Sequence, residues 1–169
     1  MRHMLAGENV GLVATRQTRD PFGVLATNAL AAHKSVARYD INSLFPLYLY
    51  PAAGEMGLER GRRPNLNPEF IAEMETRLGV RFVPHPPDPL SARGEGELGA
   101  LNNPLSVDGE GAGGEVEREP EGEVITPEDI FNYAYAVFHS PTYRSRYAEF
   151  LKIDFPRLPL TSDRRLFAA

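Results

Sequence analysis

Several polar side chains lie on and beside short apolar segments near the start of the chain: Arg16, Gln17, Arg19, Asn28, His33, Lys34 and Arg38. Arginine forms paired hydrogen bonds with guanine, asparagine and glutamine do so with adenine, and lysine or histidine meets phosphates or base edges. The set therefore suits DNA recognition, with an ordinary charged surface as the alternative. As direct readers of base edges we single out Arg16, Gln17, Arg19, Asn28 and Lys34.

Groups that could support catalysis have simpler explanations. The sequence has no Gly-x-x-x-x-Gly-Lys phosphate loop, no Gly-x-Gly-x-x-Gly that opens a helix, and no Asn-Pro-Pro-aromatic stretch of the kind that holds a flipped base in amino-methyltransferases. Glu128 and Asp129 stand where a helix start favours acidic groups, and Ser140 beside His139 is placed to cap a helix. We therefore expect no catalytic residue in this chain.

Metal and membrane sites are not indicated either. The chain has no Cys and four scattered His, so disulfides and thiolate metal sites are excluded, and we expect no metal or cofactor to bind this chain. It contains no apolar run long enough to span a bilayer, and no signal-peptide pattern follows Met1. We expect a cytoplasmic chain that does not associate with membranes.

The net charge of −5 is unevenly distributed along the chain. Residues 85–123 hold two Lys/Arg and ten Asp/Glu, whereas residues 1–84 and 124–169 are each slightly basic. The acidic segment is rich in Gly and Pro and has no apolar periodicity, which is typical of a long mobile insertion. We expect a single domain over 1–169: a strand-rich part (1–84) with one helix, the insertion (85–123), and a helical corner with an extended end (124–169).

The N-terminal part predicts strands. Apolar runs at 10–14, 24–27 and 44–50 are separated by polar stretches. Asp20, Pro21 and Gly23 have turn chemistry, with Gly23 free to take a positive φ, so the first two runs are expected to form a hairpin. Pro46 cannot donate a ladder hydrogen bond, so the third run is expected to be an edge strand or to break there.

The helices are predicted by their capping signals. Asn67 and Pro68 begin a helix that ends at Gly79, and residues 80–83 follow as a strand. Thr126 and Pro127 begin a second helix that runs to about His139. Ser140 and Pro141 begin a third, residues 154–159 are extended, and residues 165–169 look like the start of another helix. The expected fold class is α+β, with short, mostly antiparallel strands packed against about three helices.

Two long strings carry a family resemblance. The stretch 129–159, with Phe-Asn-Tyr-Ala-Tyr-Ala-Val-Phe-His-Ser-Pro-Thr-Tyr-Arg near its start, closely resembles the C-terminal specificity domain of Type ISP restriction-modification enzymes. Residues 9–17 and 45–50 look like the opening strands of the same domain. Together these segments cover most of the chain outside the acidic insertion. The resemblance fixes the scaffold and leaves the target sequence open, because base-reading positions vary among such domains.

The resemblance implies a role within a larger enzyme. Such an enzyme carries a nuclease, an ATP-driven translocase and an adenine-N6 methyltransferase that uses S-adenosylmethionine. This chain is then expected to bind double-stranded DNA beside the methyltransferase domain of the parent polypeptide, so that ATP and S-adenosylmethionine serve the parent and not this chain. We expect the chain to be a piece of that longer polypeptide.

Two further expectations concern the helical corner. Arg144, Arg146 and Lys152 lie on the more polar side of the third helix and are candidates for phosphate contacts. The alternative function is protein–protein docking, in which the aromatic helix pair binds the methyltransferase domain and the chain has little affinity for DNA by itself.

Overall fold

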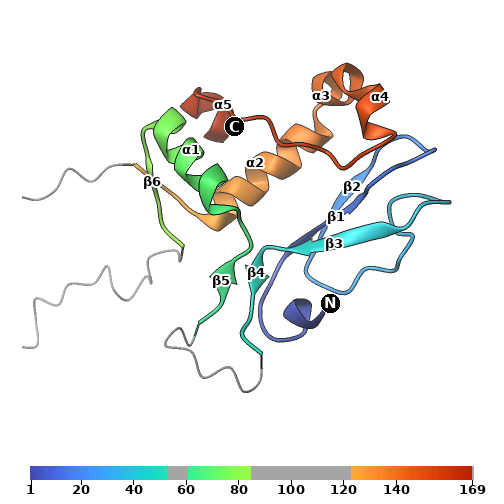
Figure 1. The fold of residues 1–169 in the computed structure, drawn as a ribbon, viewed down its shortest axis with the longest axis horizontal. Coiled ribbons are helices and arrows are strands. Elements are labelled where there is room, and N and C mark those ends of the chain that lie inside the picture. Colours follow the sequence, from blue (N-terminus) through green and yellow to red (C-terminus); the bar gives the residue numbers. More distant parts are fainter. Residues whose placement is uncertain (53–60, 85–122, 169) are drawn as a thin grey trace, which may run out of the picture.

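A computed structural model describes residues 1–52, 61–84 and 123–168 (Figure 1). The predicted insertion at 85–123 falls outside these residues, apart from Glu123. The fold is α+β, as the sequence predicted. None of the helices in the described ranges is long and apolar enough to cross a membrane.

A three-stranded antiparallel sheet forms the N-terminal part. Its order is β2-β1-β3, with β1 at Gly11–Thr15, β2 at Val24–Thr27 and β3 at Asn42–Pro46. The predicted hairpin is confirmed, because Gly11 pairs with Thr27 and Ala14 with Val24. Since β2 and β3 both run antiparallel to β1, they are parallel to each other, and the connection 28–41 has to return along the length of the sheet.

The structure tests the predictions made for Gly23 and Pro46. Gly79 has the one positive φ among the described glycines, so Gly23 does not use that freedom. Instead a Cβ on Gly23 would lie 3.3 Å from the carbonyl oxygen of Val36, which favours a residue without a side chain there. The prediction for Pro46 is confirmed: β3 is an edge strand, ends at Pro46, and the chain continues into β4.

Two small sheets extend the structure. β4 (Tyr48–Leu49) pairs antiparallel with β5 (Arg63–Pro64), and β6 (Arg81–Phe82) pairs parallel with β7 (Val124–Ile125). A short 3-10 helix, Arg2–Met4, precedes the first strand. The pairing of β6 with β7 joins the two sides of the predicted insertion, which the sequence did not indicate.

The first two long helices begin and end where their caps predict. α1 spans Pro68–Leu78, with the Asn67 side chain accepting from the Glu69 amide and Gly79 in the left-handed region at φ 62°. α2 spans Pro127–His139, and Thr126 and Asp129 form a reciprocal capping box. These contacts satisfy amide groups that a helix start leaves without internal partners.

The third helix is shorter than predicted. α3 spans Pro141–Arg146, and the chain leaves helical geometry at Tyr147 (φ −108°, ψ 18°) before α4, Ala148–Leu151. α5, Arg164–Ala168, is the further helix expected near the end. Its Arg164 guanidinium donates to the carbonyl oxygens of Leu78 and Gly79 and so closes the C-terminus of α1.

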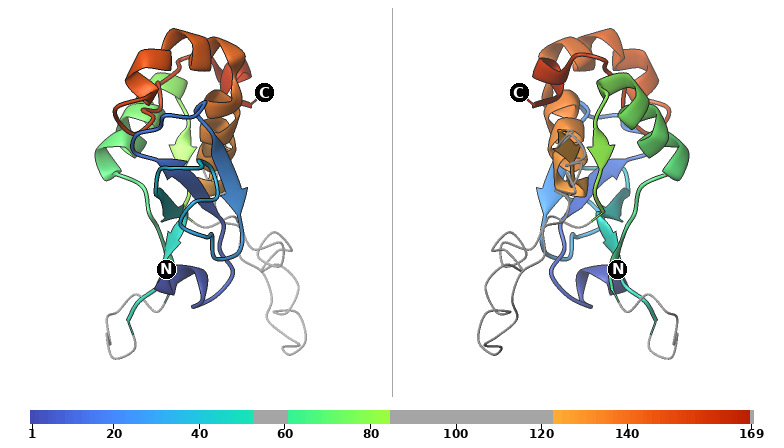
Figure 2. Two further views of the ribbon diagram at one scale, coloured as in Figure 1. Left: turned by 90° about the vertical axis from the view of Figure 1, so that its right-hand side faces the viewer. Right: turned by 90° about the vertical axis from the view of Figure 1, so that its left-hand side faces the viewer.

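The helices and the C-terminal segment gather at one side of the three-stranded sheet (Figure 2). The core between them contains Ala14 and Val24 from the sheet and Phe138, Tyr143 and Leu151 from the helices. The extended segment is held across them by two phenol hydroxyls: Tyr133 donates to the Pro159 carbonyl at 2.9 Å and Tyr143 to the Arg157 carbonyl at 2.8 Å. The aromatic string therefore builds the scaffold.

Candidate nucleic-acid interface

Two loops meet at the end of the sheet where β1 finishes. The first, residues 16–23, joins β1 to β2, and the second is the later part of the connection between β2 and β3. That second loop is anchored to the start of β3, because the Asn42 amide donates to the His33 carbonyl at 2.9 Å and the Asn42 side chain accepts from the Ser35 amide at 2.7 Å. Asn42 itself pairs with Thr15 at the end of β1.

A reciprocal pair of aspartates clasps these loops together. Asp20, in the first loop, accepts the amide of Arg38 at 2.7 Å, and Asp40, in the second loop, accepts the amide of Arg19 at 3.0 Å. Each carboxylate thus holds the backbone of an arginine in the other loop. Hydrogen bonds to a charged group are stronger than neutral ones, so the clasp gives the two loops a defined relative position.

The helical corner forms the third part of this end. The Thr18 amide donates to the Lys152 carbonyl at 3.2 Å, which fixes the first loop against the end of α4. A cavity of about 260 Å³ lies between them, lined by Thr18, Asp20, Pro21, Phe22, Arg144, Ala148, Leu151 and Lys152. We call residues 16–23, 33–41 and 152–157 together the basic end.

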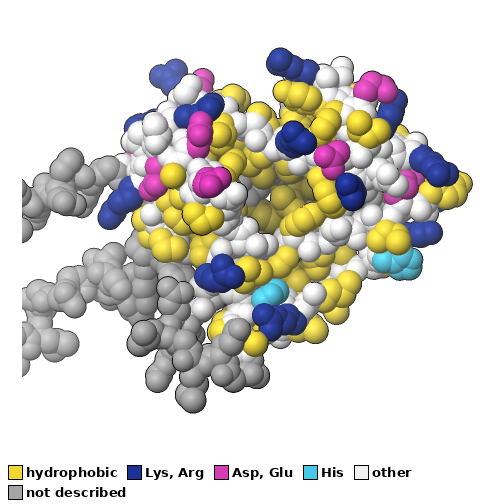
Figure 3. Space-filling model, in the orientation of Figure 1, with side chains coloured by type: hydrophobic (Ala, Val, Ile, Leu, Met, Phe, Trp, Pro, Cys, Tyr) yellow, Lys and Arg dark blue, Asp and Glu magenta, His cyan; other side chains and the backbone are white. Residues whose placement is uncertain are grey.

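The basic end holds all the excess positive charge of the described residues. It contains six Lys/Arg and three Asp, a net charge of +3, whereas the remaining described residues contain nine Lys/Arg and nine Asp/Glu. Lys and Arg side chains are visible with His and hydrophobic ones at the right-hand end of the molecule (Figure 3). The overall acidity of the chain therefore belongs to residues outside the described part.

Several predicted DNA-binding residues come together here. Arg19, Lys34 and Arg38 are exposed, and within the described residues their side-chain nitrogens make no hydrogen bond or ion pair. Gln17 and His33 are also exposed at this end. These side chains are therefore available to a ligand without first losing a partner in the described part of the chain.

Other cations of the basic end are paired on its surface. Arg16 lies 3.7 Å from Asp154, with 73% of its side chain exposed, and Arg157 lies 3.6 Å from the same carboxylate. Lys152 contacts Glu149 at 2.6 Å. Exposed ion pairs of this kind contribute little to the free energy of folding. A DNA phosphate can therefore replace the carboxylate with only a small loss of stability. Arg157 is an addition to the residues that the sequence indicated.

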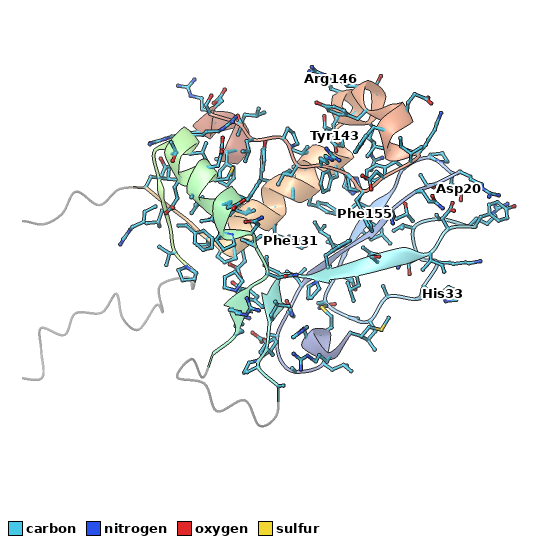
Figure 4. The ribbon with its side chains drawn as sticks, in the orientation of Figure 1. Asp20, His33, Phe131, Tyr143, Arg146 and Phe155 are labelled. Atoms are coloured by element: carbon cyan, nitrogen blue, oxygen red, sulfur yellow. The ribbon has the colours of Figure 1, made fainter. Side chains whose placement is uncertain are left out.

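Two predicted residues lie apart from this group. Asn28 follows Thr27, which pairs with Gly11 at the opposite end of β1, roughly 17 Å along the strand from Arg16 at the usual rise per residue. Arg146 lies on the outer side of α3, above Asp20 and far from His33 in Figure 4. The structure does not bring either residue into the basic end.

Arg144 has a structural role in the helical corner. Its Nε donates to the Phe138 carbonyl at 2.7 Å, near the end of α2, and its Nη2 lies 3.1 Å from Nδ1 of His139. His139 Nε2 lies 3.1 Å from the Val24 carbonyl oxygen, which can only accept. The His139 tautomer with hydrogen on Nε2 satisfies both contacts, and the ring ties the two helices to β2.

Replacing Arg144 with alanine should therefore lower the stability of the fold. Removing a hydrogen bond from a charged group, with its carbonyl partner left half-buried, predicts a decrease of about 1–3 kcal/mol in the free energy of unfolding. Urea unfolding measures this. Arg146→Ala, on the same helix and exposed, is the matched control and should change stability by less than about 0.5 kcal/mol. Equal losses of stability in both variants would contradict the role given to Arg144.

The remaining candidate groups are accounted for by the fold. Asp129 caps α2 as predicted, but Glu128 does not cap: its Oε1 accepts from the buried Tyr48 hydroxyl at 2.6 Å. Ser140 accepts from the Tyr143 amide at the start of α3, at 3.5 Å. Among the described residues, no group of three or more His, Cys, Asp or Glu is placed to hold a metal ion.

The aspartate clasp was not predicted. The sequence predicts a turn at Asp20 and gives no role to Asp40, because nothing within a few residues of either one signals a partner about 20 positions away. The available sequence signal is that Asp20 directly follows Arg19 and that Asp40 lies two residues after Arg38.

Comparison with known proteins identifies the family. No curated protein and no solved structure matches the chain. The family model described as the Type ISP C-terminal specificity domain matches residues 1–169, the whole chain. Together with the α+β fold, this match shows that the chain belongs to the Type ISP C-terminal specificity domain family, a noncatalytic domain for target recognition in a restriction-modification enzyme.

Proposed function

We propose that the basic end binds double-stranded DNA and reads the target sequence for an adenine-N6 methyltransferase in the same enzyme. The observation that carries this proposal is the location of charge: the net +3 of the described residues lies entirely at one end of the sheet. Duplex DNA attracts such a surface strongly, because binding releases counterions condensed on the phosphates. The parent enzyme would supply S-adenosylmethionine and ATP chemistry from its other domains.

Three of the direct readers have side chains that make no hydrogen bond or ion pair among the described residues. Arg19, Lys34 and Arg38 project from loops whose backbones are held by Asp20, Asp40 and Asn42. Holding the backbone while leaving the side chain free reduces the ordering cost of binding. Gln17 lies beside Arg19 in sequence and is suited to an adenine edge. Arg16 and His33 complete this reading set.

We assign the contacts with DNA phosphates to the helical corner. Lys152 and Arg157 flank the first loop and sit on a different element from the readers, so they can reach the backbone while the loops enter a groove. Contacts to phosphate position a protein on the duplex, and contacts to bases specify the sequence. Arg144 supports these contacts indirectly, because it lines the same 260 Å³ cavity as Lys152.

Selection of bound duplexes from a randomised pool by the whole chain tests this function. The chain should enrich one sequence, and the logarithm of its affinity for that duplex should fall linearly with the logarithm of salt concentration. Arg19→Ala should relax the choice at one base pair, at a cost of about 1–3 kcal/mol of discrimination, and leave the free energy of unfolding unchanged. Arg77→Ala, on α1, is the matched control.

Failure of the chain to bind any duplex at low salt would favour the docking alternative. That alternative needs exposed aromatic side chains on the helix pair. Tyr133, Phe138 and Tyr143 are instead only 5–7% exposed and pack within the chain, whereas Tyr147, between α3 and α4, is 36% exposed. Their burial favours DNA recognition over docking by this surface.

A further inference from the structure

Three large apolar side chains stand exposed within the basic end: Ile153, 70% exposed, follows α4, and the other two lie together in the second loop. Of these two, Tyr39 is 61% exposed and Ile41 is 69% exposed, and each is next to the charged Asp40. Single exposed apolar residues are common on protein surfaces and need no explanation by themselves. These two are notable because they flank Asp40, one of the two clasp residues.

The backbone around them is held on both sides. The amide of Arg38, just before Tyr39, is bound by Asp20, and the amide of Asn42, just after Ile41, is bound by the His33 carbonyl. Asp40 between them is bound to the amide of Arg19. The loop therefore presents two apolar side chains from an anchored backbone, so that binding would cost little backbone entropy.

The charge of the neighbouring residues indicates which kind of molecule Tyr39 and Ile41 bind. Arg19, Lys34 and Arg38 stand in the same two clasped loops, and their positive charge has no partner among the described residues. Two side chains amount to much less than the roughly 800 Å² that each partner buries in a stable protein–protein interface. Charge complementarity therefore favours DNA, and in the major groove the apolar feature of a base pair is the C5-methyl group of thymine.

We propose that Tyr39 and Ile41 are specificity-determining residues that contact thymine methyl groups in the major groove. The inference rests on the proposed DNA-binding function and adds the base that this part of the loop selects. Arg38 and Arg19 would then hold the flanking phosphates or guanine edges. The predicted target contains at least one thymine next to the positions read by those arginines.

Replacement of thymine by uracil, which removes only the methyl group, tests the proposal. The duplex is the one selected by the wild-type chain, with each thymine replaced by uracil in turn, and the readout is the dissociation constant. Removing one methyl group from the interface should weaken wild-type binding about fourfold at one or two positions. Ile41→Ala or Tyr39→Ala should weaken binding to the thymine duplex by a similar factor. Each variant should then bind equally well when uracil replaces the thymine that the removed side chain contacts.

Controls separate this interaction from other effects. Leu166→Ala, at a side chain that is also 61% exposed but lies on α5 at the other end of the molecule, should bind like wild type (Figure 1). Tyr39→Phe should retain the uracil sensitivity, because the ring and not the hydroxyl touches the methyl group.

Three results would overturn the inference while leaving the proposed function intact: a selected site without thymine, wild-type affinity that ignores uracil at every position, or variants that keep full uracil sensitivity. Absence of any binding by the wild-type chain would overturn both.

Discussion

Replacing Arg19, Lys34 and Arg38 together with glutamate should lower the affinity for the selected duplex by more than about a hundredfold at physiological salt. The three substitutions change the basic end from a net charge of +3 to −3. Each of the three interactions with DNA is worth about 1–3 kcal/mol, and three carboxylates then face the phosphates. The steepness of the salt dependence should fall as well, by roughly 0.9 for each phosphate that the variant no longer neutralises.

A second triple variant controls for net charge. Arg63→Glu, Arg81→Glu and Arg165→Glu make the same change of charge on exposed residues outside the basic end. This variant should keep most of the affinity, because charges more than a Debye length of roughly 10 Å from the duplex are screened. Fluorescence anisotropy of a labelled duplex measures both variants over a range of salt. An equal decrease in affinity would show that total charge, and not the basic end, controls binding.

Alkaline pH should destabilise the fold steeply above about pH 10. Burial raises the pKa of Tyr48, Tyr133 and Tyr143 above the ordinary value of 10.0, and the Glu128 carboxylate raises that of Tyr48 further. Above pH 10 the unfolded chain loses these protons while the folded chain keeps them. The unfolded state then binds fewer protons, so the free energy of unfolding falls as pH rises.

The expected slope is large because three groups contribute. Each retained proton lowers the free energy of unfolding by about 1.4 kcal/mol per pH unit, hence about 4 kcal/mol for three, and below pH 10 these groups contribute no slope. Urea unfolding between about pH 8 and pH 11, with tyrosinate absorbance followed in parallel, measures this effect.

Single tyrosine variants identify the source of this slope. Tyr143→Phe should reduce it by about one third, and Tyr39→Phe, at an exposed site, should leave it unchanged. An unchanged slope in Tyr143→Phe would show that Tyr143 ionises alike in both states.

Helices and their ends could be predicted because their determinants are local. The cap of α1 needs Asn67, Pro68 and Gly79, and that of α2 needs Thr126 and Asp129, all within one helix or its flanks. The prediction of one continuous helix after Ser140 was wrong at Tyr147, where the backbone leaves helical geometry although no Pro or Gly stands there. Leu151 of α4 shares a core cluster with Ala14 and Val24 of the sheet.

The candidate site was predicted in part. The reading set Arg16, Gln17, Arg19, His33, Lys34 and Arg38 was drawn from residue types near predicted strand ends, and the structure gathers these six at one end. Asn28 was included on the same grounds, but a strand has two ends, and the register of β1 with β2 puts Asn28 at the other one. Strand direction and register depend on pairing partners, which residue type does not encode.

The sequence by itself determined the capped helices, the strand segments, the edge strand ended by Pro46 and the family to which the chain belongs. Only the tertiary structure decided which loops meet: the Asp20 and Asp40 clasp, the pairing of β6 with β7, and the hydrogen bond of Tyr48 with Glu128 across 80 positions. The reason is physical. A cap satisfies groups a few residues away, whereas a distant contact forms only when the packing of the whole core repays the entropy of closing its loop.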